Sequence, residues 1–508
     1  MAAGIFLSRI AGLIRQKFFA YYFGTSVAAD AFNAAFRIPN MLQTLFGEGV
    51  LSASFIPEYS RLLAQGDEVR ARRLAGAVAA GLAMVSSIVV LLGVLAAPYL
   101  VALIAPGFTG ERRELTVLLT RILFPGAGLL VFSAWCLGIL NSHRKFFISY
   151  TAPVLWNLAT IVALIVYGRS TGQHRLAELF AWASVVGSAL QFGIQLPFVL
   201  PLLRGFPLNT HFRDESTRTV ARNFLPAFIS RGVVQISAFI DAYIASWLPQ
   251  GSVATLAYAQ VLYTLPVSLF GMAVSAAELP EMSRAVGTDE EVAAYLRVRL
   301  SSGLERIAFF VIPSAIAFLL LGDAVTAALY QWGRFTRSET IWVWQALAGS
   351  TIGLLASTWG RLYSSAFFAL RDTRTPRNFA LIRVFLTITL GFVFALGIPY
   401  WTGIDKKWGV MGLTASAGIA GWVEFFLLRD RLEKRIGTMR IPRSRVMALW
   451  GAAVGAAAAG WGMKLLLYGA VTAWTAIAVL AVFGVVYLVL TVVLGVPAAR
   501  ALVSRIRR

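Results

Sequence analysis

Apolar stretches of 18 or more residues recur along the whole of this 508-residue chain. A stretch of that length spans the roughly 30 Å hydrocarbon core of a bilayer as one α-helix. Composition agrees, because 58% of the residues are hydrophobic and only 14% are charged, whereas about 25% are charged in an average soluble domain. The sequence therefore predicts an all-α polytopic membrane protein with about 14 transmembrane helices. The predicted helices lie near residues 3–24, 27–60, 75–104, 115–140, 147–168, 177–203, 221–248, 253–283, 300–321, 340–369, 378–399, 409–428, 446–468 and 473–497.

The distribution of charge predicts how these helices are oriented. The net charge of +21 would suggest a nucleic acid partner if the protein were soluble. Here, 10 of the 45 Lys and Arg residues lie inside the apolar stretches, 27 lie in one set of alternate loops and 8 lie in the other. Cytoplasmic loops of membrane proteins are rich in Lys and Arg. We therefore expect both termini in the cytoplasm and no nucleic acid partner.

Sequence signals of catalysis and of processing are absent. The chain has no G-x-x-x-x-G-K-[ST] loop for ATP and no H-E-x-x-H zinc motif, and His143, His174 and His211 are isolated. The single cysteine, Cys136, excludes an internal disulfide, and the N-terminus lacks the basic start and small-residue cleavage site of a secretory signal. We expect a protein that is not an enzyme, needs no cofactor or metal, and keeps its N-terminus as the first helix. Any transport would be driven by an ion gradient, the membrane potential or consumption of the substrate on the far side.

A duplication divides most of the chain into two halves. Leu45–Gly47 and Pro57–Arg61 in the first half correspond to Leu269–Gly271 and Pro280–Arg284 in the second, at offsets of 224 and 223 residues. Each half contains six predicted helices, so both would enter the membrane with the same orientation, as in two-lobed transporters. The duplication could also be an ancient relic that is kept only for folding. Two shorter matches at nearly the same offset pair Ser8-Arg9 with Ser230-Arg231 and Gly107-Phe108-Thr109 with Arg334-Phe335-Thr336.

The duplication predicts three regions. Residues 1–205 form an N-lobe of six helices, residues 206–440 a C-lobe of six helices, and residues 441–508 a further helix pair with a basic tail. Small residues in the first helix of that pair, such as Gly455 and Gly460, favour close helix packing. Substrate sites of two-lobed transporters lie at the interface between the repeats, and the additional helix pair could line a groove for a lipid tail.

The first helix carries three basic residues, Arg9, Arg15 and Lys17. Arg15 lies roughly 18 Å along this helix, near the bilayer midplane, where a cation costs about 3 kcal/mol. A charge at this depth is retained when it faces a hydrated cavity, which favours an anionic cargo. The alternative is a packing seam of small residues whose arginines reach out to the membrane surface. That alternative suits Arg9, near the cytoplasmic end, better than it suits Arg15.

The second predicted helix contains Asp30, Arg37, Pro39 and Glu48. Asp30 and Arg37 are two turns apart on one face, so they could pair only loosely or through a third group. Pro39 would interrupt the helix and free a backbone carbonyl, a feature that transporters use as a bend or gate. Alternatively, Asp30 caps the helix N-terminus at the outer surface. Asp241 is a further acid within the seventh predicted helix.

Several motifs of the chain belong together in one transporter family. The motifs are Ser8-Arg9, Gly12, Arg15, Asp30-Ala31-Phe32, Arg37-Ile38-Pro39-Asn40-Met41-Leu42, Phe46-Gly47-Glu48-Gly49, Phe55-Ile56-Pro57, Ala105-Pro106-Gly107-Phe108, Leu140-Asn141, Ala152-Pro153, Asn157, Gln235-Ile236-Ser237, Gly251-Ser252-Val253, Gly333-Arg334-Phe335-Thr336 and Thr375-Pro376. With them the chain resembles the MurJ (MviN) family of lipid II flippases, within the multidrug/oligosaccharidyl-lipid/polysaccharide exporter superfamily, over nearly its whole length up to about residue 440.

The resemblance implies two six-helix lobes around a cationic central cavity, and a hydrophobic groove near the last two helices for a polyprenyl tail. The implied cargo is lipid II, the undecaprenyl-diphosphate-linked disaccharide-pentapeptide precursor of peptidoglycan, which would cross the bacterial cytoplasmic membrane by alternating access. Membrane lipid and cell-wall synthesis enzymes are further candidate partners. The candidate cavity cations are Arg9, Arg15, Arg37 and Arg231. The candidate gate or ion-coupling carboxylates are Asp30, Glu48 and Asp241.

The chain departs from the family pattern mainly in the second lobe. The usual Tyr-x-Asp-Arg-Leu motif of the eighth helix reads Tyr258-Ala259-Gln260-Val261-Leu262, and a nearby Glu is Thr264. Arg231 is the nearest candidate to replace the missing cation. In the first lobe, Gln43 stands where a basic residue is common. Two alternative functions follow: a flippase for another polyprenyl-diphosphate-linked glycan, and a non-transporting membrane scaffold for cell-wall synthesis, against which the cations of the first helix argue.

Overall fold

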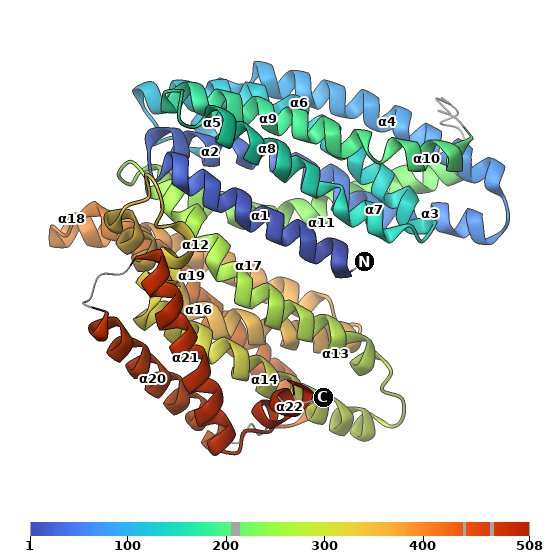
Figure 1. The fold of residues 1–508 in the computed structure, drawn as a ribbon. Helices are drawn as coiled ribbons and strands as arrows, with labels where there is room; N and C mark the ends of the chain where they lie inside the picture. Colours follow the sequence, from blue (N-terminus) through green and yellow to red (C-terminus); the bar gives the residue numbers. More distant parts are fainter. Residues whose placement is uncertain (1, 205–213, 440–442, 468–471, 507–508) are drawn as a thin grey trace. The chain divides into compact units, whose positions relative to one another are not determined.

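The computed structural model describes residues 2–204, 214–439, 443–467 and 472–506, whose course is shown in Figure 1. These residues form helices and loops and contain no strand, which confirms the predicted all-α class. Ten helical runs among them are long and apolar enough to cross a membrane. Helix α1 (Ala2–Phe23) is not one of the ten, because its three cations make it too highly charged. The full number of transmembrane helices stays a prediction.

The chain forms two compact units, Met1–Ala254 and Thr255–Arg508. Helix α11 (Glu215–Ser246) packs on α3 (Val50–Ala64) inside the first unit, although the duplication assigns α11 to the C-lobe. The predicted lobes describe the repeat and the units describe the packing, so the lobe boundaries stay a prediction. The other elements of the first unit are α1, α2 (Val27–Leu42), η1 (Gln43–Gly49), α4 (Glu68–Leu95), α5 (Ala97–Ile104), α6 (Gly110–Ser142), α7 (Phe146–Thr151), α8 (Pro153–Tyr167), α9 (Gln173–Gly193) and α10 (Leu196–Leu203).

The second unit contains nearly all of α12 (Ser252–Pro266) and the elements after it. Its last long helices pack on α14 and α15. A Cβ atom at Gly460 would lie only 2.9 Å from Leu321 Cδ1, so a small residue permits the close packing predicted there. The elements are η2 (Val267–Met272), α13 (Ala273–Ser283), α14 (Asp289–Leu320), α15 (Gly322–Tyr330), α16 (Arg337–Ala369), α17 (Arg374–Phe392), η3 (Val393–Gly397), α18 (Ile398–Thr402), η4 (Lys406–Trp408), α19 (Gly409–Ile436), α20 (Arg443–Leu466), α21 (Ala473–Val493) and α22 (Pro497–Ile506).

Both copies of the repeat leave α-helical geometry at the same motif. Leu45–Gly47 lies in the π-helical turn η1, and Leu269–Gly271 lies in the π-helical turn η2. Such turns are rare and often mark functional sites. In a further repeat match, Thr109 and Thr336 are the N-cap residues of α6 and α16. The duplication therefore extends from the sequence to the local structure of each unit.

The prediction that Pro39 interrupts its helix is wrong. Helix α2 continues through Pro39 to Leu42, and the helical geometry changes only at Gln43, where η1 begins. The N–H of Gln43 still donates to the carbonyl groups of Asn40 and Pro39. The irregular turn therefore follows the proline by one helical turn.

Aromatic packing holds α1 against α2 and α9. The ring centroid of Phe19 lies 5.4 Å from that of Phe32 and 5.4 Å from that of Phe180, and the rings of Phe32 and Phe180 are 4.6 Å apart. All three side chains are buried, and each such pair adds about 0.5–1.5 kcal/mol beyond its buried area. The cluster fixes the rotation of α1 about its axis. It thereby sets the direction of Arg15, one turn before Phe19.

Candidate functional site

Arg15 lies in the middle of α1 with its side chain half-buried. Its guanidinium carbon lies 4.9 Å from the ring centroid of Trp156 in α8, and Nη2 donates a hydrogen bond of 3.4 Å to Oε1 of Gln16. A cation over an indole face gains about 0.5–1 kcal/mol at an exposed site and about 2 kcal/mol when desolvated. The cation is therefore held inside the unit by these contacts, and its role in a cavity stays a prediction. Arg9, nearer the start of α1, is exposed.

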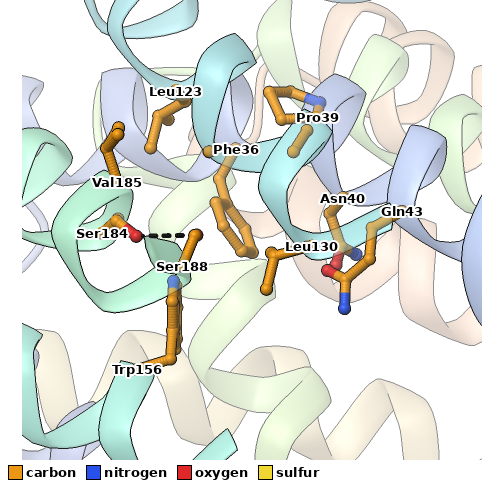
Figure 2. A pocket seen from close by; sticks show the side chains of 12 residues that line it. Phe36, Pro39, Asn40, Gln43, Leu123, Leu130, Trp156, Ser184, Val185 and Ser188 are labelled. Carbon is orange, nitrogen blue, oxygen red and sulfur yellow. Dashed lines mark hydrogen bonds between the residues drawn. The ribbon is translucent and has the colours of Figure 1, made fainter. Parts of the chain in front are cut away.

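A narrow pocket lies beyond Trp156, among α2, α6, α8 and α9 (Figure 2). The ring of Phe36 lies 5.7 Å from that of Trp156 and forms part of its lining. Asn40 and Gln43, at the end of α2, supply amide groups. The volume is about 10 Å³, which is enough for about one water molecule. The pocket is thus a mostly apolar gap that shares Trp156 with the Arg15 contact, and it is too small for a lipid head group.

Arg37 of α2 has an acidic neighbour in α11. Asp241 interacts electrostatically with Arg37, and both side chains are half-buried. In such a pair on adjacent helices, a bound anion can replace the acid as the partner of the cation, and a bound cation can replace the arginine as the partner of the acid. The structure thus brings two of the predicted site residues together. Asp30, with which Arg37 could pair only loosely or through a third group, lies in a different cluster.

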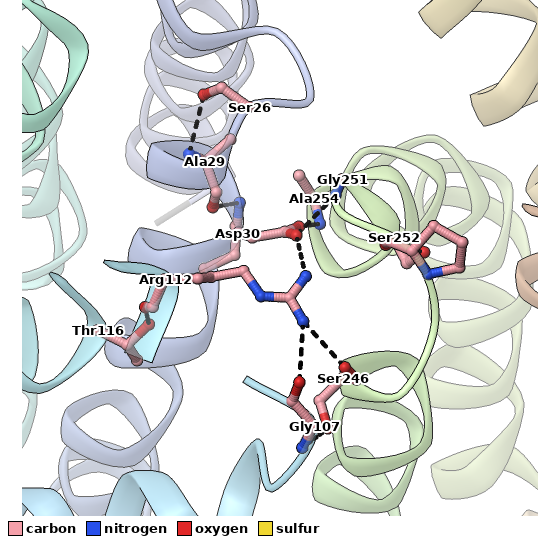
Figure 3. Close-up of polar contacts among 12 residues, drawn as sticks. Ser26, Ala29, Asp30, Gly107, Arg112, Thr116, Ser246, Gly251, Ser252 and Ala254 are labelled. Atoms are coloured by element: carbon pink, nitrogen blue, oxygen red, sulfur yellow. Dashed lines mark hydrogen bonds and ion pairs between the residues drawn. The ribbon is translucent and has the colours of Figure 1, made fainter. Parts of the chain in front are cut away.

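Asp30 is completely buried in the first turn of α2. Its Oδ2 accepts hydrogen bonds from Nη1 of Arg112 at 3.2 Å and from the N–H of Gly251 at 2.7 Å, and its Oδ1 accepts one from the N–H of Ala254 at 2.8 Å (Figure 3). The alternative that Asp30 caps its own helix is wrong, since Ser26 is the N-cap of α2. Asp30 instead satisfies backbone N–H groups at the start of α12, where a negative charge is favourable.

Arg112 completes this buried cluster. Its Nη2 donates to the carbonyl groups of Gly107 at 3.4 Å and Ser246 at 3.0 Å, and its guanidinium lies 3.8 Å from the ring centroid of Phe108. A Cβ atom at Gly107 would lie 2.3 Å from the carbonyl oxygen of Ser246, so only glycine fits this approach. Arg112 thus ties α2, α6 and the end of α11 together. Sequence reasoning counted Arg112 as a loop charge and missed this role.

Two predicted site residues lie partly outside the described residues. Arg231 falls within α11 and Glu48 within η1, but their side chains are not among those that the structure describes. Their roles therefore stay predictions.

In the second unit, the departures in α12 lie near other cations. Gln260 is exposed and donates a hydrogen bond of 3.3 Å to Thr264. One turn from Gln260, the hydroxyl of Tyr263 bonds to that of Ser357 at 2.9 Å and interacts electrostatically with Arg361 and Arg383. These two arginines lie in α16 and α17. From the sequence they are expected to reach out to the cytoplasmic membrane surface, and their interaction with Tyr263 comes from the tertiary structure.

A second ion-pair cluster in this unit joins α13 to α14. The carboxylate of Glu278 is buried, with Nε of Arg299 at 3.0 Å and Nη1 of Arg306 at 3.4 Å. Arg383 also has an acidic partner, Glu424 of α19, at 3.0 Å. Glu278 and Glu424 are therefore neutralised by neighbouring arginines.

Comparison with known proteins places the chain in a family. The family described as lipid II flippase MurJ matches residues 19–494. The lipid II flippase MurJ of Burkholderia cenocepacia is 32% identical over 439 residues, which cover 84% of this chain and 82% of that protein.

Solved structures share the fold. One of lipid II flippase MurJ in an inward closed conformation has a TM-score of 0.79 at 23% identity, over 97% of this chain and 98% of the other. An inward-facing multidrug resistance MATE family transporter of the MOP superfamily has a TM-score of 0.65 at 19% identity, over 85% and 96% of the two chains. Together with the match along most of its sequence, this shows that the chain belongs to the lipid II flippase MurJ family.

Proposed function

We propose that this protein moves lipid II from the cytoplasmic to the outer leaflet of the bacterial cytoplasmic membrane, by alternating access and without catalysis. The observation that carries the proposal is the family match to lipid II flippase MurJ over residues 19–494. The half-buried Arg15 supports it, because a polyprenyl-diphosphate cargo would bring an anion to a cation inside the membrane.

Arg9, Arg15 and Arg37 would hold the diphosphate. Phosphate oxygens accept charge-assisted hydrogen bonds from guanidinium groups, each worth about 1.5–3 kcal/mol. Arg37 already interacts with Asp241, so a bound diphosphate would compete with this carboxylate for the same cation. The exchange would give the cargo different affinities for two states of the protein, which alternating access requires.

The remaining predicted residues have supporting roles in this proposal. Arg231 would add a cation from α11, and Glu48 would act in the π-helical turn as a gate carboxylate. Asp30 would contribute to gating by holding the start of α12, through its hydrogen bonds to Gly251 and Ala254. An ion gradient, the membrane potential or consumption of lipid II outside would drive the cycle.

The proposed orientation places both termini in the cytoplasm. It rests on the excess of Lys and Arg in one set of alternate loops. In this orientation, the loop after α6 is cytoplasmic and the loop containing Lys406 is outside.

A flippase for another polyprenyl-diphosphate-linked glycan is the second candidate. The observation that favours it is Gln260-Val261 in α12, where the family usually carries an acid and an arginine. A cargo of this kind would still carry a diphosphate that the cations of the first unit can bind, and it would differ from lipid II in its sugar.

Complementation of a strain depleted of its only lipid II flippase tests the proposal. The wild-type chain should restore growth, and Arg15→Ala should abolish rescue while leaving the amount of membrane-inserted protein unchanged, since it removes a charge from the membrane interior. Arg169→Ala, which removes an exposed cation after α8, is the matched control and should rescue fully.

The outcomes separate the candidates. Full rescue by the double variant Arg9→Ala/Arg15→Ala would contradict the cationic mechanism and favour a scaffold. Failure of the well-inserted wild-type chain to rescue would favour the second glycan.

A further inference from the structure

An open groove lies on the surface of the first unit, between α5 and the first half of α6. Its volume is about 390 Å³, and its lining is Pro98, Arg113, Glu114, Val117, Leu118 and Arg121. Arg113, Val117 and Arg121 recur every fourth residue, so they follow one face of α6. None of these residues belongs to the candidate substrate site.

The two arginines of the groove have no hydrogen-bond or ion-pair partner among the residues that the structure describes. Arg113 and Arg121 are exposed, and neither makes a hydrogen bond or ion pair with any residue in the described ranges. Arg112, next to Arg113 in the first turn of α6, differs from these two arginines because its guanidinium forms an ion pair with Asp30. The groove also contains one exposed acid, Glu114. Its net charge is therefore positive, with two guanidinium groups free to bind an anion.

Helices α4 and α5 carry exposed apolar side chains that face lipid. Leu91, Leu95 and Leu103, from α4 and α5, are 60%, 64% and 70% exposed, in a protein whose apolar surface lies in a bilayer. Tyr99, next to Pro98 in the groove wall, is 79% exposed. Tyr is enriched where the hydrocarbon meets the head groups, so its position favours a groove at that level.

The length of α6 also places Arg121 at the level where the hydrocarbon meets the head groups. The polar end of the helix begins at Asn141, and a hydrocarbon core of roughly 30 Å takes about 20 residues. Counting back from Leu140, these residues end at Arg121. Arg121 therefore lies at the boundary between hydrocarbon and head groups, and Arg113, two turns further, lies among the head groups. Lipid phosphates occupy this level.

We propose that the groove binds an anionic glycerophospholipid of the surrounding membrane. Arg121 binds the phosphodiester at the hydrocarbon boundary, Arg113 attracts the outer part of the head group, and the acyl chains lie against the exposed leucines of α4 and α5. Glu114 opposes anion binding and limits the groove to a lipid of low negative charge. The proposal needs only the membrane-spanning fold and does not depend on the identity of the cargo.

Native mass spectrometry of the purified full-length protein with phosphatidylglycerol tests the proposal. Arg113→Ala/Arg121→Ala should weaken the binding of this lipid by about fivefold for each arginine removed. The matched control is Arg169→Ala/Arg175→Ala, which removes two exposed cations outside the groove. It should leave binding within about twofold of wild type. Glu114→Gln should tighten binding, because it removes a like charge.

Each other outcome would overturn the proposal. Equal losses in the groove variant and in the control would mean that overall charge, and not the groove, attracts the lipid. An equal loss of phosphatidylcholine would mean that the groove does not select anionic lipids. Stronger competition by undecaprenyl phosphate than by phosphatidylglycerol would mean that the groove serves a polyprenyl-linked lipid. Unchanged thermal unfolding of the groove variant shows that it is folded, since the two arginines make no hydrogen bond or ion pair with the described residues.

Discussion

The guanidinium of Arg112 lies 3.2 Å from the carboxylate of Asp30, although 82 residues separate them in the sequence. The carboxylate is completely buried and the guanidinium side chain is 12% exposed. Around this pair, the backbone N–H groups of Gly251 and Ala254 and the carbonyl of Ser246 complete the hydrogen bonds. The pair is thus a fixed joint among α2, α6 and the start of α12.

Breaking this joint should destabilise the protein strongly. Asp30→Asn leaves Arg112 as a buried charge without its counter-ion, which costs about 3–5 kcal/mol. Thermal unfolding of the purified protein measures the loss. Asp430→Asn, which breaks the exposed pair with Lys434, is the control and should cost less than about 1 kcal/mol. Similar melting temperatures for the two variants would contradict the stabilising role of the pair of Asp30 and Arg112.

The pair of Arg37 and Asp241 should behave as a switch for the cargo. Asp241→Asn frees Arg37, so lipid II binding should tighten while transport slows, because the competing carboxylate no longer drives release. Arg37→Ala should weaken binding by about tenfold or more, the value of one charge-assisted hydrogen bond. Native mass spectrometry measures binding and complementation measures transport. The exchange model fails if Asp241→Asn weakens binding as much as Arg37→Ala does.

Gln260 and Val261 of α12, which stand where the family usually carries an acid and an arginine, should lower the affinity of the protein for the diphosphate. Val261→Arg restores the family's cation, and binding of lipid II should tighten by about tenfold. A charge buried without its acid offsets part of the gain, so Gln260→Asp/Val261→Arg should bind better than Val261→Arg alone. Competition with a labelled precursor measures the order of affinities. If the double variant binds no better than wild type while Arg231→Ala abolishes binding, the cation of α11 has taken over this role.

The stability that Asp323 provides should depend on pH in one direction. Burial raises the pKa of Asp323, but hydrogen bonds from Lys464 of α20 at 2.6 Å and Arg337 at 2.7 Å outweigh burial, so the pKa lies below its ordinary value. Its contribution is then complete above the unfolded carboxyl pKa of about 3.9 and is lost as the pH falls through the lowered folded value.

The comparison of Asp323→Asn with wild type checks this dependence. The difference in unfolding temperature should stay constant from about pH 5 to pH 8 and shrink in stronger acid. Lys464→Ala should also loosen α20, because it removes one of the two cations. A difference that grows as the pH falls would have the wrong sign for a depressed pKa.

Cysteine labelling should reveal the orientation in the membrane. A cysteine at Lys406 should react with an impermeant reagent added outside intact cells, and a cysteine at Lys145 should not. Both positions are exposed, but they lie in loops that are predicted on opposite sides of the membrane. The native Cys136 is buried and should give little background. Labelling at Lys145 alone would reverse the orientation.

The helices could be predicted from the sequence because the signal for them is local. Hydropathy within about 20 residues decides whether a segment crosses a bilayer, and the predicted segments 115–140 and 409–428 lie inside α6 and α19. The repeat was also visible, because both copies keep the same motif in a π-helical turn. The prediction from the proline of α2 was wrong, since membrane helices tolerate a proline where other groups can satisfy the freed backbone.

The partners of the charges could be decided only by the tertiary structure. The depth of Arg15 follows from counting residues along α1, but its stacking on Trp156 depends on how α8 packs, 141 residues later in the chain. The sequence alone predicts that Arg112 is an ordinary loop cation, whereas in the folded protein it is buried against Asp30. A residue's position along a helix is set by its own segment, whereas the neighbour that neutralises its charge comes from another helix, and only packing brings the two within hydrogen-bonding distance.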